Sequence, residues 1–234
     1  MLAGLSPSVV RAVTMFSFIA IGMQMRRKTS VLNSLFISLF ILLLVNPYFI
    51  FQVGFQLSYL AVFAIVTIQP KLFKLWQPKF KITKYFWGLL SVSIAAQIGV
   101  LPLSLFYFHQ FPGLFFLSNL VVLPVLGIIL GLSILVILLS LLNLLPNFIA
   151  ETYGKLISLM NQFISWVAGK EEFVFTDIHF NIWQNLSAYL LIISFILLLY
   201  QKSFRNLVFF LCGILIFQNS MLYSKMQNST SESI

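Results

Sequence analysis

The sequence predicts an all-α fold, a polytopic bundle of transmembrane helices. Of the 234 residues, 60% are hydrophobic and only 8% are charged, whereas soluble domains carry about 25% charged residues. Several apolar runs approach or exceed the ~20 residues that span a bilayer. We therefore expect about seven spans, a half-helix and an amphipathic helix, in a transmembrane domain over residues 1–223 followed by a polar tail over residues 224–234.

The first helix is expected from Pro7 to about Met25. Ser6 is a good N-cap, Pro7 suits the first helical position, and the basic run Arg26-Arg27-Lys28 ends the apolar segment. Arg11 lies in the second turn of this helix. Its guanidinium either reaches the outer interface along its own aliphatic stem or points inward as a fixed positive charge.

The second and third helices are separated by Pro47. The apolar run Val31–Val45 ends just before this proline, which should stop one helix and open the next. A third span is expected over Tyr48–Ile68. Gln52 and Gln56 lie near its start, where two amides in an apolar segment are candidates to line a polar path.

A basic segment follows the third span and holds five lysines without any acid: Lys71, Lys74, Lys79, Lys81 and Lys84. By the positive-inside rule this segment and Arg26–Lys28 are cytoplasmic. The alternating crossings then place the N-terminus outside and a fourth helix, Tyr85–Phe106, running outward. The lysines are equally explained as a topology signal that contacts anionic lipid.

The stretch from Ser91 to Pro124 is apolar but contains polar residues and prolines that a simple lipid anchor does not need. Pro102 and Pro124 each free a backbone carbonyl, beside Gln97 and Asn119. Bare backbone is tolerated at membrane depth only where protein or water covers it. We expect a half-helix over Leu114–Leu123, a full span over Val125–Leu145, and a path lined by Gln97, Ser118 and Asn119. The alternative is two proline kinks with amides that hold helices together.

The remaining chain contains one amphipathic segment and two further spans. In Asn147–Ala168 polar residues recur at helical spacing and form a stripe. This helix therefore either lies in the membrane interface or lines a water-filled space. The acidic segment that follows it holds Glu171, Glu172 and Asp177. The spans Trp183–Tyr200 and Leu207–Tyr223 are separated by a short basic turn.

Several classes of site are not supported by the sequence. Cys212 is the sole cysteine, and His109 and His179 are far apart without acidic or cysteine neighbours, so no metal site is expected. No carboxylate occurs in residues 1–150 to serve a proton-coupled transporter. We expect no bound cofactor and no enzymatic activity.

Three segments resemble the ComEC competence proteins, the membrane channels of bacterial DNA uptake. They are GLSPSVVRA at residues 4–12, NPYFIFQVGFQLSYLAVFAI at residues 46–65 and AAQIGVLPLSLFYFHQFPGLFFLSNLVVLPVLG at residues 95–127. They occur in the family's order with similar spacing. Complete members look longer, with an OB-like domain before this region and often a metallo-β-lactamase-like domain after it. Neither segment is in this sequence, so no nuclease activity is carried over.

The resemblance implies a multi-pass protein of the bacterial inner membrane that passes single-stranded DNA into the cytoplasm. Lipid surrounds it, and a DNA receptor, a cytoplasmic motor or further copies of the chain are implied partners. The expected path residues are Arg11, Gln52, Gln56, Gln97, Ser118 and Asn119, the helix breaks Pro47, Pro102 and Pro124, and the outer mouth Tyr107, Phe108, His109 and Phe111.

Two other interpretations remain open. The mouth aromatics equally suit a lipid-facing belt. A small-solute or lipid transporter with a broken-helix site explains the prolines, and an inactive fragment of a longer competence protein explains the short chain.

Overall fold

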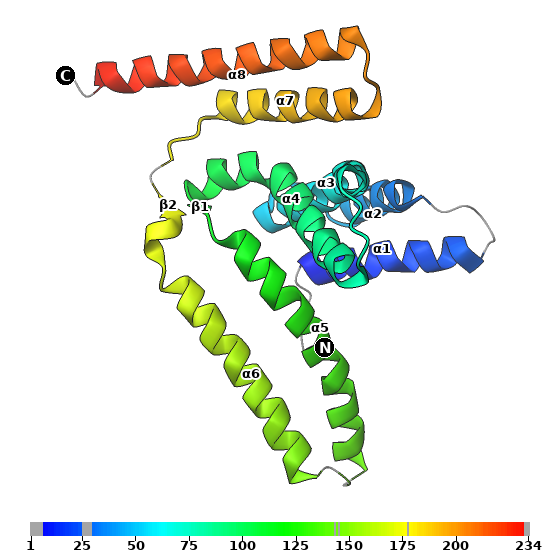
Figure 1. Ribbon diagram of the computed structural model, residues 1–234. Helices are drawn as coiled ribbons and strands as arrows, with labels where there is room; N and C mark the ends of the chain where they lie inside the picture. Colours follow the sequence, from blue (N-terminus) through cyan, green and yellow to red (C-terminus); the bar gives the residue numbers. More distant parts are fainter. Residues whose placement is uncertain (1–6, 25–29, 143, 145, 177, 232–234) are drawn as a thin grey trace.

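The computed structural model describes residues 7–24, 30–142, 144, 146–176 and 178–231 and confirms an all-α fold (Figure 1). Five helices are long and apolar enough to cross a membrane: α3 (Val53–Leu75), α4 (Lys81–Phe108), α5 (Phe115–Leu141), α7 (Ile182–Tyr200) and α8 (Phe204–Ser231, over its part Phe204–Ser224). The shorter apolar helices are α1 (Pro7–Gln24) and α2 (Val31–Val45), and α6 (Asn147–Ala168) is amphipathic. The fold class was therefore predictable from composition and periodicity.

The second helix has the predicted bounds, but the third begins later than expected. Pro47 opens a short 3₁₀ helix, η1 (Pro47–Phe51), because the Asn46 side chain accepts the Tyr48 amide at 3.0 Å and caps the turn. α3 starts only at Val53 and runs past Pro70 to Leu75. The predicted span Tyr48–Ile68 is thus wrong at both ends, since a capped turn takes its first residues and one proline near the end does not stop the helix.

Helices α3 and α4 pack closely through small residues. Gly99 of α4 lies against Ala64 of α3, and a Cβ at Gly99 would stand 2.8 Å from the Leu60 carbonyl oxygen. Ser91 and Ala95, at steps of four before Gly99, are fully buried. Small residues let helix backbones approach within a membrane, so this pair forms the tightest contact in the described part of the fold.

The prolines inside α4 and α5 do not break these helices. α4 continues through Pro102 and bends, and α5 continues through Pro124, so the predicted half-helix is wrong (Figure 1). A proline removes one helical hydrogen bond. Ending a helix in an exposed apolar segment would leave more backbone groups without partners, which lipid does not tolerate.

Two short strands join segments far apart in the chain. β1 (Phe111–Pro112) pairs antiparallel with β2 (Val174–Phe175), which follows the 3₁₀ helix η2 (Glu171–Phe173). The Gly113 amide donates to the Phe173 carbonyl at 2.8 Å, and the Ile178 amide to the His109 carbonyl at 3.1 Å. α5 begins just after β1 and α6 ends just before β2, so the two helices form a hairpin that starts and ends at this pairing (Figure 1).

The last two helices form an antiparallel pair held by polar side chains. The hydroxyls of Ser187 and Ser220 lie 2.9 Å apart, and Gly213 lets α8 approach α7 at Leu191. α8 continues to Ser231 and so includes most of the segment expected to be a polar tail. At the other end of α7, the Tyr200 hydroxyl donates to the Thr67 carbonyl of α3 at 3.3 Å.

Candidate functional site

Arg11 belongs to a polar cluster that joins the first three helices. Its guanidinium carbon lies 5.7 Å from the centre of the Tyr59 ring on α3. The Tyr59 hydroxyl lies 3.0 Å from Ser38 Oγ of α2, which donates to the Leu35 carbonyl at 2.8 Å. Of the two positions considered for this charge, the structure has the inward one.

One nitrogen of Arg11 is buried without a partner. Nη1 is shielded from solvent and makes no hydrogen bond among the described residues. A buried guanidinium nitrogen without an acceptor is costly, and the face of an aromatic ring compensates only part of that cost. The cluster therefore holds a positive charge that the described residues leave incompletely satisfied.

The two glutamines near Pro47 serve the local turn. Gln56 donates through Nε2 to the Ile50 carbonyl at 2.6 Å, and Gln52 is the exposed residue between η1 and α3. Gln56 also borders a cavity of about 280 Å³ whose other lining is Leu39, Ile50, Phe55, Tyr59, Leu60 and Leu103. Its amide donor is thus already engaged beside a space that is otherwise nearly all apolar.

The bend at Pro102 contains a residue that the sequence did not reveal. The Tyr189 hydroxyl of α7 donates to the Gly99 carbonyl at 3.2 Å and interacts with the Leu103 amide. These two groups would pair with each other in an undisturbed helix. Gln97 is half-buried nearby. Only the tertiary structure brings residue 189 to this bend, and no local pattern around it signals the contact.

Ser118 and Asn119 border a cavity of about 310 Å³ between the start of α5 and the end of α6. Lys170 and Phe173 line the same cavity. The Ser118 hydroxyl donates to the Leu114 carbonyl at 3.2 Å. The polar side chains at this end therefore gather around the β1–β2 pairing rather than in the middle of the bundle.

The predicted mouth residues surround the same pairing. Tyr107, Phe108 and His109 are exposed, and His109 ends α4 in the left-handed conformation with φ of 55°. Phe111 stacks on Phe175, with ring centres 6.4 Å apart. This stack, together with the strand pairing, fixes the turn that carries His109.

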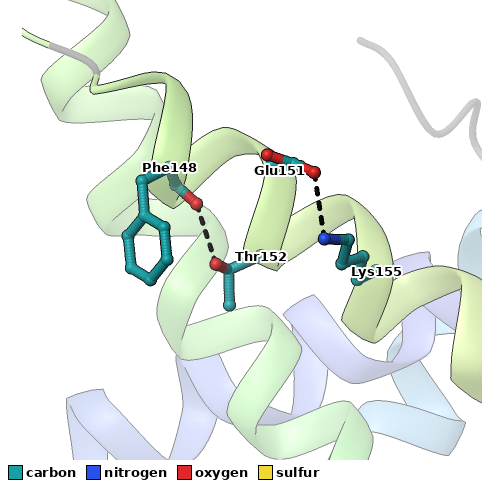
Figure 2. Close-up of polar contacts among 4 residues, drawn as sticks. All are labelled: Phe148, Glu151, Thr152 and Lys155. Atoms are coloured by element: carbon teal, nitrogen blue, oxygen red, sulfur yellow. Dashed lines mark hydrogen bonds and ion pairs between the residues drawn. The ribbon is translucent and has the colours of Figure 1, made fainter.

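The polar stripe of α6 begins beside the cavity that this helix shares with α5. Ile149, Tyr153 and Leu156 line an apolar cavity of about 490 Å³ shared with α5. Thr152 and Lys155 also line this cavity. Lys155 Nζ lies 2.9 Å from Glu151 Oε1, and the Thr152 hydroxyl donates to the Phe148 carbonyl at 2.8 Å (Figure 2). The stripe therefore starts at the rim of the cavity, with the side chains of Glu151 and Lys155 largely exposed.

The helix breaks and path candidates do not form one continuous site. In the part of the chain that the structure describes, no hydrogen bond joins Arg11, Gln97 and Asn119 to one another. They occupy three separate places: the α1–α3 cluster, the α4 bend and the α5–α6 cavity. Within the same residues no group of three or more His, Cys, Asp or Glu side chains is placed to hold a metal ion.

Comparison with known proteins identifies the family. The profile described as "Competence protein" matches residues 1–202. The chain belongs to this competence protein family. ComE operon protein 3 of Bacillus subtilis (strain 168) is 31% identical over 181 residues, which are 76% of this chain and 22% of that protein. The chain thus spans about a fifth of the relative it matches. No solved structure matches it.

Within this competence-family chain the predicted basic loop is shorter than expected. Lys71 and Lys74 are on α3, and Lys81 and Lys84 are on α4, so only the linker between the two helices, with Lys79, is outside helix. Lys71 Nζ lies 4.6 Å from the centre of the Tyr200 ring. The five lysines therefore mark one end of the α3–α4 pair, and the end of α7 lies beside it.

Proposed function

We propose that this chain forms part of the passage that carries single-stranded DNA across the bacterial inner membrane during uptake. Its membership of the competence family over residues 1–202 is the observation that carries the proposal. The absence of Asp and Glu from residues 1–150 supports it, since a polyanion would meet no fixed negative charge there. No specific observation favours the solute-transporter alternative.

The proposed orientation has the lysine-rich end of α3 and α4 in the cytoplasm. The Lys71–Tyr200 contact then puts the turn after α7 on the same side. The β1–β2 pairing puts residues 173–175 beside the His109 turn, which is on the outer side in this proposed orientation. α6 returns from the end of α5 to this pairing, so in this orientation it crosses alongside α5.

Arg11 is the proposed fixed charge of the passage. Its buried, unpartnered Nη1 supports a role for an anionic group at the α1–α3 cluster. The protein would act without catalysis or cofactor, in lipid and with other uptake proteins or further copies of itself. The driving force would come from a partner.

The test is transformation with marked DNA in cells that lack this gene. DNA should still bind outside but fail to reach a nuclease-resistant state inside. In the complemented strain, Arg11→Ala should lower uptake because it removes the positive charge. Arg11→Glu should lower it by about tenfold or more, because a negative charge repels the DNA and each 1.4 kcal/mol of lost stabilisation is a factor of ten. Gln97→Ala and Asn119→Ala are expected to impair complementation as well.

Lys155→Ala is the matched control for Arg11→Ala. Both remove one positive charge, but Lys155 is exposed on α6, so its loss should leave uptake unchanged at equal membrane levels. Normal transformation of a deletion strain without a second copy of the gene would overturn the proposal and bring solute transport forward.

A further inference from the structure

The last turns of α3 meet the end of α7, so the α3–α4 linker and the turn between α7 and α8 lie at the same end of the molecule. Tyr200, the last residue of α7, carries Lys71 over its ring at 4.6 Å and donates to the Thr67 carbonyl at 3.3 Å. The two segments are separated by more than a hundred residues in the sequence. Their contact makes one surface from residues 71–87 and 197–206, called here the two-turn surface.

The two-turn surface carries positive charge only. Its described residues include no Asp or Glu, and its basic members are Lys71, Lys74, Lys79, Lys81, Lys84, Lys202 and Arg205. The ion pair between Glu151 and Lys155 lies elsewhere, on α6. A cluster of this kind attracts polyanions over a distance of about 10 Å at moderate salt.

Exposed aromatic side chains alternate with these charges. Phe80 is 77% exposed and is flanked by Lys79 and Lys81, while Phe204 is 80% exposed and precedes Arg205. Trp76 and Tyr200 are also more than half exposed. Proteins that follow single-stranded nucleic acid combine basic groups for the phosphates with aromatic faces on which bases stack.

The surface is held in place by hydrogen bonds to its backbone. Asn206 Nδ2 donates to the carbonyls of Leu197 and Gln201, at 3.2 and 2.8 Å, and so closes the turn between α7 and α8. On the other side, Trp87 Nε1 donates to the Phe73 carbonyl at 3.2 Å. The backbone that carries the charges and rings is fixed in this way, so binding has to order the side chains but not the turn.

We propose that the two-turn surface binds single-stranded DNA as it leaves the helical bundle. Lys202 and Arg205 contact its phosphates, and Phe204 provides a stacking face. This inference rests on the proposed function and extends it, because it adds the turn after α7 to the lysine-rich end and assigns a stacking role. The phosphate of an anionic lipid is the competing occupant, but a lipid headgroup has no base to stack.

The test measures binding of a fluorescent oligo-dT to the full chain in nanodiscs of phosphatidylcholine. The double variant Lys202→Gln/Arg205→Gln should weaken binding several-fold and make the dependence of log K on log salt less steep by about 1.4, from ~0.7 for each phosphate contact. Phe204→Leu keeps an apolar side chain but removes the ring, and should weaken binding several-fold through lost stacking. Lys155→Gln, another exposed lysine, should change neither value.

Three outcomes separate the possibilities. An unchanged affinity for oligo-dT in both variants overturns the inference. The proposed function is then tested by the deletion strain alone. If Lys202→Gln/Arg205→Gln weakens attachment to phosphatidylglycerol vesicles but leaves oligo-dT binding unaffected, the surface binds lipid headgroups. That result also overturns the inference. Weaker oligo-dT binding in both variants, with Lys155→Gln unchanged, supports the binding site, and a deletion strain that transforms normally would then overturn only the passage of DNA through the bundle.

Discussion

Helices α4 and α5 are both long and apolar enough to cross a membrane, but they bury very different shares of their residues. In the most apolar stretch of α4, 28% of the residues are buried, against 6% in α5. α3 and α4 meet through Gly99, Ala64 and Ala95, whereas a Cβ added at Gly127 or Gly131 of α5 would have no neighbouring atom within 4 Å. The mean hydropathy is 3.0 in this stretch of α5 and 1.9 in that of α4, so the less buried helix is the more apolar one.

This difference assigns separate tasks to the two regions. Helix α4 is fixed on one side by α3 and on the other by Tyr189 of α7, so it serves as the scaffold that positions the His109 turn and the lysine-rich end. The hairpin contacts the rest mainly through β1–β2 and the start of α5. Its stability should depend on lipid more than on side-chain packing.

The largest expected effect is at the tight contact. Gly99→Ala would place a methyl group against Ala64 and 2.8 Å from the Leu60 oxygen, and overpacking of this kind costs about 1–3 kcal/mol. Gly127→Ala, in open space on α5, should instead raise stability by up to about 1 kcal/mol, because alanine favours helix. Unfolding followed by tryptophan fluorescence in detergent measures both.

The two glycine variants define the comparison sharply. Equal unfolding midpoints for Gly99→Ala and Gly127→Ala would mean that α3 and α4 are no closer in solution than α5 and α6. In that case small residues in α4 would carry no packing role.

A smaller effect is expected at the α4 bend. Tyr189→Phe removes the hydroxyl that lies between the Gly99 carbonyl and the Leu103 amide, which should lower the free energy of unfolding by about 1 kcal/mol. Tyr153→Phe is the control, because Tyr153 lines the apolar cavity of the hairpin and its hydroxyl has no hydrogen bond within the described residues. Its effect should stay within about 0.5 kcal/mol. Equal losses in both variants would mean that the Tyr189 hydroxyl does not stabilise the α4 bend.

The helix positions were largely predictable because their limits are local. Val31–Val45 is bounded by a basic run and an Asn-Pro pair, and the structure has the same bounds. The prolines at 102 and 124 suggest helix breaks in the sequence, but each removes only one helical hydrogen bond. In an apolar environment the rest of the hydrogen-bond ladder keeps the helix intact.

The tertiary contacts could not be predicted from the sequence in the same way. The β1–β2 pairing uses strands of two residues each, too short for any periodicity to show. Tyr189 reaches α4 across 90 positions of sequence, and Tyr200 reaches α3 across 133. The path residues were chosen for polarity alone, so the sequence could not show that Gln56 is engaged in its own turn or that Arg11 lies on Tyr59.

The smallest effect is expected on the polar stripe of α6. The Glu151 and Lys155 side chains are 66% and 76% exposed, and their ion pair at i and i+4 is 2.9 Å long (Figure 2). In water such a pair contributes about 0.3–0.5 kcal/mol, so Glu151→Gln should change stability by no more than that, with a smaller difference still at high salt.

If this side of α6 meets lipid, the loss of stability in Glu151→Gln should be much larger, because a lysine left unpaired in a low-dielectric medium costs several kcal/mol. The double variant Glu151→Gln/Lys155→Gln would then recover most of that loss. Unfolding of the three proteins at low and high salt therefore measures whether this side of α6 meets water or lipid.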